Sequence, residues 1–305
     1  MGSHGNGDNG LSEPRAYNPL NFNLGQNSYD ASDRHTEGEL PWAQRRKAIA
    51  QSIVYHRPGI IGLQEVLHHQ LTDLLTLLQS MPSTFDPNQL SPAKWEYVGV
   101  GREDGRKEGE YTPIIFDSSR FKLDIAKTFW LSETPSRPSR GWDAANVRTC
   151  TAARFSPREF PYFNFTILNT HLDHIGVDAR RKSAMLILEV LKSIDDPVFL
   201  MGDLNSDTED DAYKTLSQSY RLGDTFEAAA VRFGNFYTFT GFDEGRTDPE
   251  SRIDHIFMDK TPRKLLFDRD QERTVHISVH AVDNNRYDDG MYLSDHRPVI
   301  VDAIM

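Results

Sequence analysis

The chain has 305 residues and a formal net charge of −11, with 38% hydrophobic and 26% charged residues. This composition is that of a soluble globular protein, and the length allows one large domain or two ordinary ones. No segment approaches a run of about 18 apolar residues, so we expect no integral membrane association. The acidic balance argues against tight, non-specific binding of long nucleic acid but is compatible with a small phosphorylated substrate.

The N-terminal residues 1–14 are rich in Gly, Asn, Ser and Asp, and we interpret them as a disordered tail before a single domain at 15–305. They lack the apolar stretch of a secretory signal and the Arg-rich bias of a transit peptide. Cys150 is the only cysteine, which rules out an internal disulfide and fits a reducing, cytoplasmic location. Its strand-like surroundings predict a buried small side chain rather than a nucleophile.

Helices and strands alternate through the first half of the chain. Pro41 can begin a helix, and residues 43–56 carry apolar side chains at helical spacing until Pro58 and Gly59 interrupt them. A short apolar strand at 60–63 ends at Gln64 and Glu65, and a second helix is predicted at 71–78. Further strands are predicted at 95–100, 111–116, 127–131 and 148–155.

The second half continues this alternation. A strand at 162–169 leads to His171, and a long helix is predicted at 177–194. A buried strand at 198–201 leads to Asp203, and later strands are predicted at 252–258, 274–282 and 299–303. This mixture of βα units and hairpin-like strand pairs predicts an α/β sandwich of two mixed β-sheets with helices outside.

Polar residues recur at the ends of the apolar strands. In α/β proteins the chemistry concentrates at strand ends, because a rigid scaffold there projects side chains into a cleft. We expect six such motifs to act together: Asn21-Phe22-Asn23, Gln64-Glu65, Thr170-His171, Asp203-Leu204-Asn205, Asp254-His255 and Asp295-His296.

Three of these residues have the chemistry of a metal site. Glu65 and Asp295 are hard oxygen donors, and Asn23 can add a neutral carbonyl oxygen. Such a set suits an octahedral Mg²⁺ or Mn²⁺ ion completed by waters. The histidine-rich segment at 171–174 is an alternative zinc cluster, but it has no cysteine nearby and no H-E-x-x-H motif.

The remaining residues suit phosphoryl chemistry. Asp203 and Asn205 are two apart, so on an extended segment both project to one face, where one can orient a water and the other contact a phosphate oxygen. His171 and His296 can donate hydrogen bonds to the charge that builds on a pentacoordinate phosphorus. Two carboxylates are candidates for fixing the orientations of these histidines: Asp254 and Glu110.

Together these motifs resemble the endonuclease/exonuclease/phosphatase superfamily, whose members include pancreatic deoxyribonuclease, abasic-site endonucleases, neutral sphingomyelinases and inositol polyphosphate 5-phosphatases. The match extends from about Asn21 to the C terminus, with the motifs in the family's order. The resemblance implies a four-layer, DNase-I-like sandwich and metal-dependent hydrolysis of phosphoester bonds. The matching segments are N-F-N at 21–23, Q-E-V at 64–66, N-T-H at 169–171, G-D-L-N at 202–205, R-I-D-H-I at 252–256 and S-D-H-R-P at 294–298.

The resemblance also implies a role for each matching residue. Glu65 would be the principal metal ligand, helped by Asn23 and Asp295. Asp203 would orient or deprotonate the attacking water, and Asn205 would bind the scissile phosphate. The remaining implied roles are transition-state stabilisation by His171 and His296, with Asp254 orienting His296 and Glu110 orienting His171.

A narrower resemblance links the chain to a branch of small soluble members of unassigned substrate. It rests on Y-V-G-V-G-R at 97–102, F-W-L-S-E-T-P at 129–135, G-W-D-A-A at 141–145 and N-R-Y-D-D-G at 285–290. These segments are expected to shape the pocket. Trp130, Trp142, Arg148 and Tyr287 are candidate substrate contacts, with a structural role as the alternative for each.

We therefore expect a Mg²⁺- or Mn²⁺-dependent hydrolase acting on a small phosphorylated substrate, such as a sugar, inositol or lipid headgroup phosphate. A metal-dependent nuclease acting on DNA or RNA is the main alternative. A catalytically silent binding module is the third hypothesis, but it predicts the loss of a catalytic residue, and Glu65, Asp203, Asn205 and His296 are all present. The sequence does not specify an oligomeric state.

Overall fold

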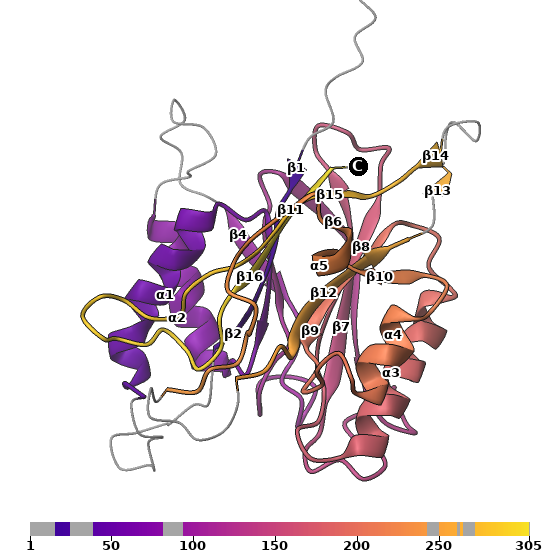
Figure 1. Cartoon of the computed structure of the whole chain (residues 1–305), viewed down its shortest axis with the longest axis horizontal. Coiled ribbons are helices and arrows are strands. Elements are labelled where there is room, and N and C mark those ends of the chain that lie inside the picture. The colour runs from indigo at the N-terminus through magenta and orange to yellow at the C-terminus, as the bar shows by residue number, and fades with distance from the viewer. Residues whose placement is uncertain are drawn as a thin grey trace, which may run out of the picture.

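The computed structural model describes residues 16–24, 39–81, 94–242, 250–260, 263–264 and 272–304. In this part of the chain two mixed β-sheets pack face to face, with helices α1 (Trp42–His56) and α2 (His68–Ser80) on one side and α3 (Val177–Leu191) and α4 (Asp211–Ser217) on the other (Figure 1). The predicted four-layer sandwich is confirmed.

The first sheet has the strand order β11-β15-β16-β2-β3-β5-β4, and β1 pairs with β16 beside this path. The β2–β3 and β11–β15 pairs are parallel, and the other pairs are antiparallel. The strands are β1 (Ala16–Tyr17), β2 (Pro19–Asn23), β3 (Ile60–Gln64), β4 (Trp95–Val98), β5 (Ile114–Asp117), β11 (Val231–Gly234), β15 (His276–Val282) and β16 (Val299–Ile304).

The second sheet has the order β10-β12-β9-β8-β7-β6, in which only β8 and β9 run parallel. Two short strands, β13 (Arg263–Lys264) and β14 (Glu272–Arg273), form a separate pair, and the short helix α5 is Thr225–Ala228. The strands of the second sheet are β6 (Phe121–Trp130), β7 (Thr149–Pro157), β8 (Phe165–His171), β9 (Val198–Asp203), β10 (Leu222–Asp224) and β12 (Asp254–Asp259).

Alternation along the central strands builds the core. In β9, Phe199 and Met201 face the core between the two sheets, whereas Val198 and Leu200 face the core under α3 and α4. A third apolar core lies between the first sheet and α1 and α2. Because both faces of β9 are covered, its sequence is a continuous apolar run rather than an alternating one.

Most of the long predicted elements are confirmed, with shifted ends. The helix predicted at 71–78 begins three residues earlier, at His68, and the strand predicted at 127–131 is the end of the ten-residue strand β6. Cys150 is buried, as expected, and burial raises the pKa of its thiol. The tail at 1–14 lies outside the described residues, so its disorder and the domain boundaries stay predictions.

No helix among the described residues is long and apolar enough to cross a membrane.

Candidate active site

The strand registers bring the polar motifs to one end of the sandwich. In the second sheet, Asp203 at the end of β9 pairs with His171 at the end of β8 and with Asp254 at the start of β12. In the first sheet, Asn23 at the end of β2 lies beside Gln64 at the end of β3. Residues from five strands thus meet where both sheets end at the same side.

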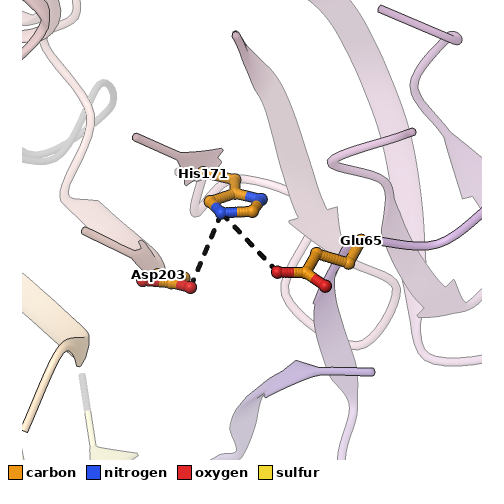
Figure 2. A group of neighbouring side chains, drawn as sticks. All are labelled: Glu65, His171 and Asp203. Atoms are coloured by element: carbon orange, nitrogen blue, oxygen red, sulfur yellow. Dashed lines mark ion pairs between the residues drawn. The ribbon is translucent and has the colours of Figure 1, made fainter. Parts of the chain in front are cut away.

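Asp203 lies at the centre of this group. Its Oδ2 accepts a hydrogen bond of 2.9 Å from Asn23 Nδ2 and lies 3.6 Å from His171 Nε2 and 3.9 Å from His296 Nε2. Glu65 is the second carboxylate: its Oε1 lies 3.9 Å from His171 Nε2 and accepts from Asn23 Nδ2 at 3.2 Å. Figure 2 shows the His171 imidazole facing both acids.

The acids are crowded. Burial raises the pKa of Glu65 to about 8, and repulsion from Glu110 and Asp295 adds to the shift. Burial also raises the pKa of Asp203 to about 6, with repulsion from Asp254 as the next cause. Carboxylates that resist ionisation in the protein alone are stabilised as anions by a bound cation. Glu65 and Asp203 belong, with the His171 ring turned toward them, to a group that could hold a metal ion, and their carboxylate oxygens fit a divalent cation.

The pKa values of the two histidines are shifted in opposite directions. His296 Nδ1 lies 2.7 Å from Asp254 Oδ2, and although burial alone would lower the pKa of His296, the Asp254 carboxylate outweighs it and holds that pKa well above its usual value. His171 Nδ1 lies 2.9 Å from Arg148 Nη1, and burial and then this positive charge hold the pKa of His171 well below its usual value. An arginine can only donate, so His171 carries its proton on Nε2. Both rings therefore direct an Nε2–H toward Asp203.

Strained backbone accompanies the site. Four non-glycine residues in the described ranges have a left-handed φ, and Glu65 (57°) and Asn205 (46°) are two of them. Such conformations cost free energy; they occur at helix ends, as at Arg57 after α1, and at sites where the surroundings hold a functional side chain in place. The backbone N–H of Asn205 donates to Asp203 Oδ1 at 2.7 Å, and Asn205 Nδ2 donates to the carbonyl of Leu172 at 3.0 Å. These bonds fix both side chains.

Two predicted roles differ from the observed contacts. Glu110 Oε2 accepts from Arg102 at 2.6 Å and lies 3.9 Å from His171 Nδ1, so Arg148 rather than Glu110 contacts this ring directly. Asn23 turns its amide nitrogen, not its carbonyl oxygen, toward the two acids. The Asn23 Nδ2 group donates to both carboxylates and lies between them. Asp295 lies close enough to contribute to the raised pKa of Glu65.

The candidate substrate contacts do not converge on the acids. Arg148 is 5% exposed, and its donors are directed at protein groups. Trp142 is partly buried with the ammonium of Lys182 5.7 Å from its ring centroid. The Tyr287 hydroxyl donates to the carbonyl of Ala48 in α1, so this side chain packs on the helix. Trp130 is buried and donates its indole N–H to the carbonyl of Arg102.

Sequence reasoning missed the residues that hold the site from behind. Asp173 accepts backbone N–H bonds from Ala145, Asn146, Ile175 and Gly176 and joins two loops beside His171. Burial alone would raise the pKa of Asp173, but these bonds hold it below its usual value. A carboxylate two residues after His171 was the available signal, and its partners are distant in sequence.

Comparison with known proteins identifies the family. A sequence model of the Endonuclease/Exonuclease/phosphatase family matches residues 20–296, which include every strand-end motif of the site. The chain belongs to this family. Members of the endonuclease/exonuclease/phosphatase family hydrolyse phosphoester bonds, so the family assignment supports that class of reaction for the chain.

Two solved structures of the family resemble the whole chain. An endonuclease/exonuclease/phosphatase family protein from Bacteroides thetaiotaomicron is 31% identical, with a TM-score of 0.80 over 96% of this chain and 99% of that one. A mannosyl-6-phosphatase from the same organism is also 31% identical, with a TM-score of 0.75 over 95% and 100%. Nocturnin of Drosophila melanogaster is 26% identical over 218 residues, which are 69% of this chain and 31% of that protein. The chain thus spans about a third of the length of this curated relative.

Proposed function

We propose that the protein is a Mg²⁺- or Mn²⁺-dependent phosphatase or phosphodiesterase of small phosphorylated molecules, with sugar phosphates as the first candidates. The observation that carries the proposal is the placement of Asp203 between the Nε2–H groups of His171 and His296, beside Glu65. The similarity to a mannosyl-6-phosphatase at 31% identity over nearly the whole chain supports a sugar phosphate, and the net charge of −11 argues against long nucleic acid as the substrate.

In this proposal Glu65 holds the cation, with Asp295 beside it and Asn23 spacing Glu65 from Asp203. The ion, when bound, neutralises charge on the phosphoryl oxygens. The carboxylate oxygens of Glu65 and Asp295 favour a hard cation such as Mg²⁺ or Mn²⁺.

The protein's own groups carry the remaining steps. Asp203 Oδ2 orients the attacking water and accepts its proton while the water oxygen bonds to phosphorus and the bond to the leaving oxygen breaks. The leaving oxygen takes up a proton from solvent and departs as an alcohol. The Nε2–H groups of His171 and His296 donate to the non-bridging oxygens, where negative charge builds. Asn205 holds the phosphate, and Asp254 keeps His296 protonated and oriented.

A substrate panel tests the proposal. Purified protein is incubated with sugar phosphates, inositol phosphates, an aryl phosphodiester, single-stranded oligonucleotide and plasmid, each with Mg²⁺, Mn²⁺ or a chelator. We expect sugar phosphates to release phosphate fastest, with activity lost on chelation. The variants Asp203→Asn and His296→Gln are expected to lose at least about 100-fold in kcat.

Asp302→Asn and His276→Gln are the matched controls. Both residues lie at the ends of β16 and β15 away from the Val299–Val282 pair that borders the site. They are expected to retain wild-type activity. Metal-independent hydrolysis, or unchanged activity in Asp203→Asn, would contradict the mechanism. Cleavage of nucleic acid at lower enzyme concentrations than any small phosphoester would establish the nuclease alternative instead.

A further inference from the structure

One guanidinium supports two histidines. Arg148 Nη1 lies 2.9 Å from Nδ1 of His171, and Arg148 Nη2 lies 3.1 Å from Nδ1 of His174. Its Nε donates to Asp173 Oδ2 at 3.4 Å. The proposed mechanism uses His171 but leaves His174 without a task.

The hydrogen bonds from the Arg148 guanidinium determine which ring nitrogen of His174 carries the proton. Because arginine donates and never accepts, the Nδ1 of each ring must be the acceptor, and each neutral ring carries its proton on Nε2. His171 is buried and faces the acids, whereas His174 is exposed. His174 therefore presents a neutral N–H donor to solvent, one guanidinium away from a histidine that faces the phosphoryl site.

A second segment is tied by hydrogen bonds to the loop that carries His174. Asp173 accepts the backbone N–H groups of Ala145 and Asn146, both at 3.0 Å, and Asp143 Oδ1 accepts that of Ala179 in α3 at 2.6 Å. The segment so held carries Trp142, whose φ of 47° is left-handed. Glu65 and Asn205 share this left-handed φ, as does Arg57 at the C-cap of α1.

The charges of this rim, defined as Trp142, His174 and Lys182, are nearly balanced. The Lys182 ammonium lies 5.7 Å from the Trp142 ring centroid, and it also pairs with Asp178 at 2.6 Å. An indole ring and an N–H donor carried by these two joined segments suit a group with C–H faces and hydroxyl oxygens. A nucleic acid backbone would instead favour several uncompensated cations.

We propose that this rim binds the polyhydroxylated part of a phosphorylated substrate. His174 Nε2–H donates to a hydroxyl oxygen, the Trp142 ring packs against the C–H face, and Arg148 acts as the positioning residue behind both histidines. The inference rests on the proposed function and specifies which part of the substrate this side of the site recognises.

Kinetics on paired substrates tests it. Wild type, His174→Ala and His174→Gln are assayed with a hexose phosphate and with an aryl phosphate that has no hydroxyl groups. Loss of one neutral hydrogen bond is expected to raise the hexose phosphate KM about 3- to 10-fold in His174→Ala, with kcat within about twofold. His174→Gln, which retains an N–H donor, is expected to recover part of this loss. The aryl phosphate KM is expected to stay unchanged.

The control is His276→Ala, which removes another exposed histidine, on β15. Thermal unfolding of each variant checks that the fold is retained, because a merely structural role would lower the melting temperature without separating the two substrates. An equal KM change on both substrates, or none on the hexose phosphate, overturns the inference while metal-dependent hydrolysis still supports the proposed function. If the wild-type protein cleaves oligonucleotide but no sugar phosphate, both the proposed function and this inference are wrong, because the substrate next to the rim would be a nucleotide.

Discussion

His171 and His296 each present an Nε2–H donor, but His171 does so as a neutral ring and His296 as a cation. His296 is held as a cation by Asp254 at 2.7 Å, and His171 is held neutral by Arg148 at 2.9 Å. Two imidazolium ions this close to one another would repel, and two neutral rings would leave the phosphoryl charge less stabilised. Pairing one cation with one neutral ring supplies two N–H donors at the cost of one buried positive charge.

Two other buried histidines, His255 and His280, link single residues to the stability of the fold. Burial, and then the positive charge of Arg252, lower the pKa of each to about 4. An unfolded imidazole has a pKa of about 6.5, so below that pH the unfolded chain takes up protons that the folded chain refuses. Stability is therefore constant above pH 6.5 on this account and falls as the pH drops toward 4.

We expect His255→Gln to weaken this pH dependence. Each such histidine contributes about 2 kcal/mol to the difference in unfolding free energy between pH 7.5 and pH 5. The variant keeps an N–H donor for the carbonyl of Ser206, which His255 Nε2 contacts at 3.0 Å. Urea unfolding of both proteins at the two pH values, with chelator present, measures the difference. The exposed variant His276→Gln is the control, and identical pH dependence in wild type and His255→Gln would contradict the assignment.

At the scale of elements, the end of β2 and the segment before β16 are tied together. Arg45 of α1 is 1% exposed and donates from Nη1 to the carbonyls of Leu24 at 3.0 Å and Leu293 at 2.6 Å. Ser294 Oγ donates to the carbonyl of Asn23 at 2.7 Å. These bonds set the spacing between Asn23 and Asp295 across the proposed metal site.

Arg45→Lys is expected to weaken cation binding, because one ammonium with three donors cannot replace the four hydrogen bonds that the guanidinium makes from three nitrogens. Loss of such supporting contacts typically costs 10- to 100-fold in metal affinity, so the half-activating Mg²⁺ concentration should rise about tenfold or more. Binding of Mn²⁺ followed by calorimetry gives the same constant without turnover. Arg46→Lys is the matched control, since Arg46 is the next residue on α1 and pairs with Asp73 at the surface. A lower melting temperature with an unchanged metal constant would show that Arg45 only stabilises the fold.

The sequence was most informative where local pattern and structure coincide. The strand at 198–201 could be predicted because both of its faces are buried, and in the structure β9 continues to Asp203 as its last residue. The strand β10 spans three residues and depends on pairing with β12, so no local pattern predicts it. The roles of Arg148 and Arg45 depend on imidazole and carbonyl partners that are distant in sequence, so no local pattern predicts them. The family resemblance implies Glu110 as the residue that orients His171, whereas Arg148 makes the direct contact.

At the scale of the whole molecule, both sheets end in acids at one place. Glu65 follows β3 of the first sheet, and Asp203 and Asp254 lie at the ends of β9 and β12 in the second. Burial, with repulsion from neighbouring acids, raises the pKa of Glu65 to about 8. A carboxyl group with a raised pKa stabilises the fold fully below its unfolded pKa of about 4.5, and that stability is lost as the pH rises through 8. The metal-free protein is therefore less stable to unfolding at neutral pH than at low pH on account of Glu65. A bound cation removes this loss of stability.

Glu65→Gln should accordingly separate stability from metal binding. At pH 7.5 in chelator the variant is expected to melt at a higher temperature than wild type, because a neutral amide replaces a crowded acid. Wild type should gain about 2.7 kcal/mol when the cation is present at 100 times its dissociation constant, whereas the variant should gain little. Thermal unfolding with and without Mg²⁺ or Mn²⁺ measures both effects, and Asp302→Asn should retain the wild-type shift. If the cation stabilised Glu65→Gln as strongly as wild type, Glu65 would not be a metal ligand. The meeting of acids from both sheets would then not be explained by metal binding.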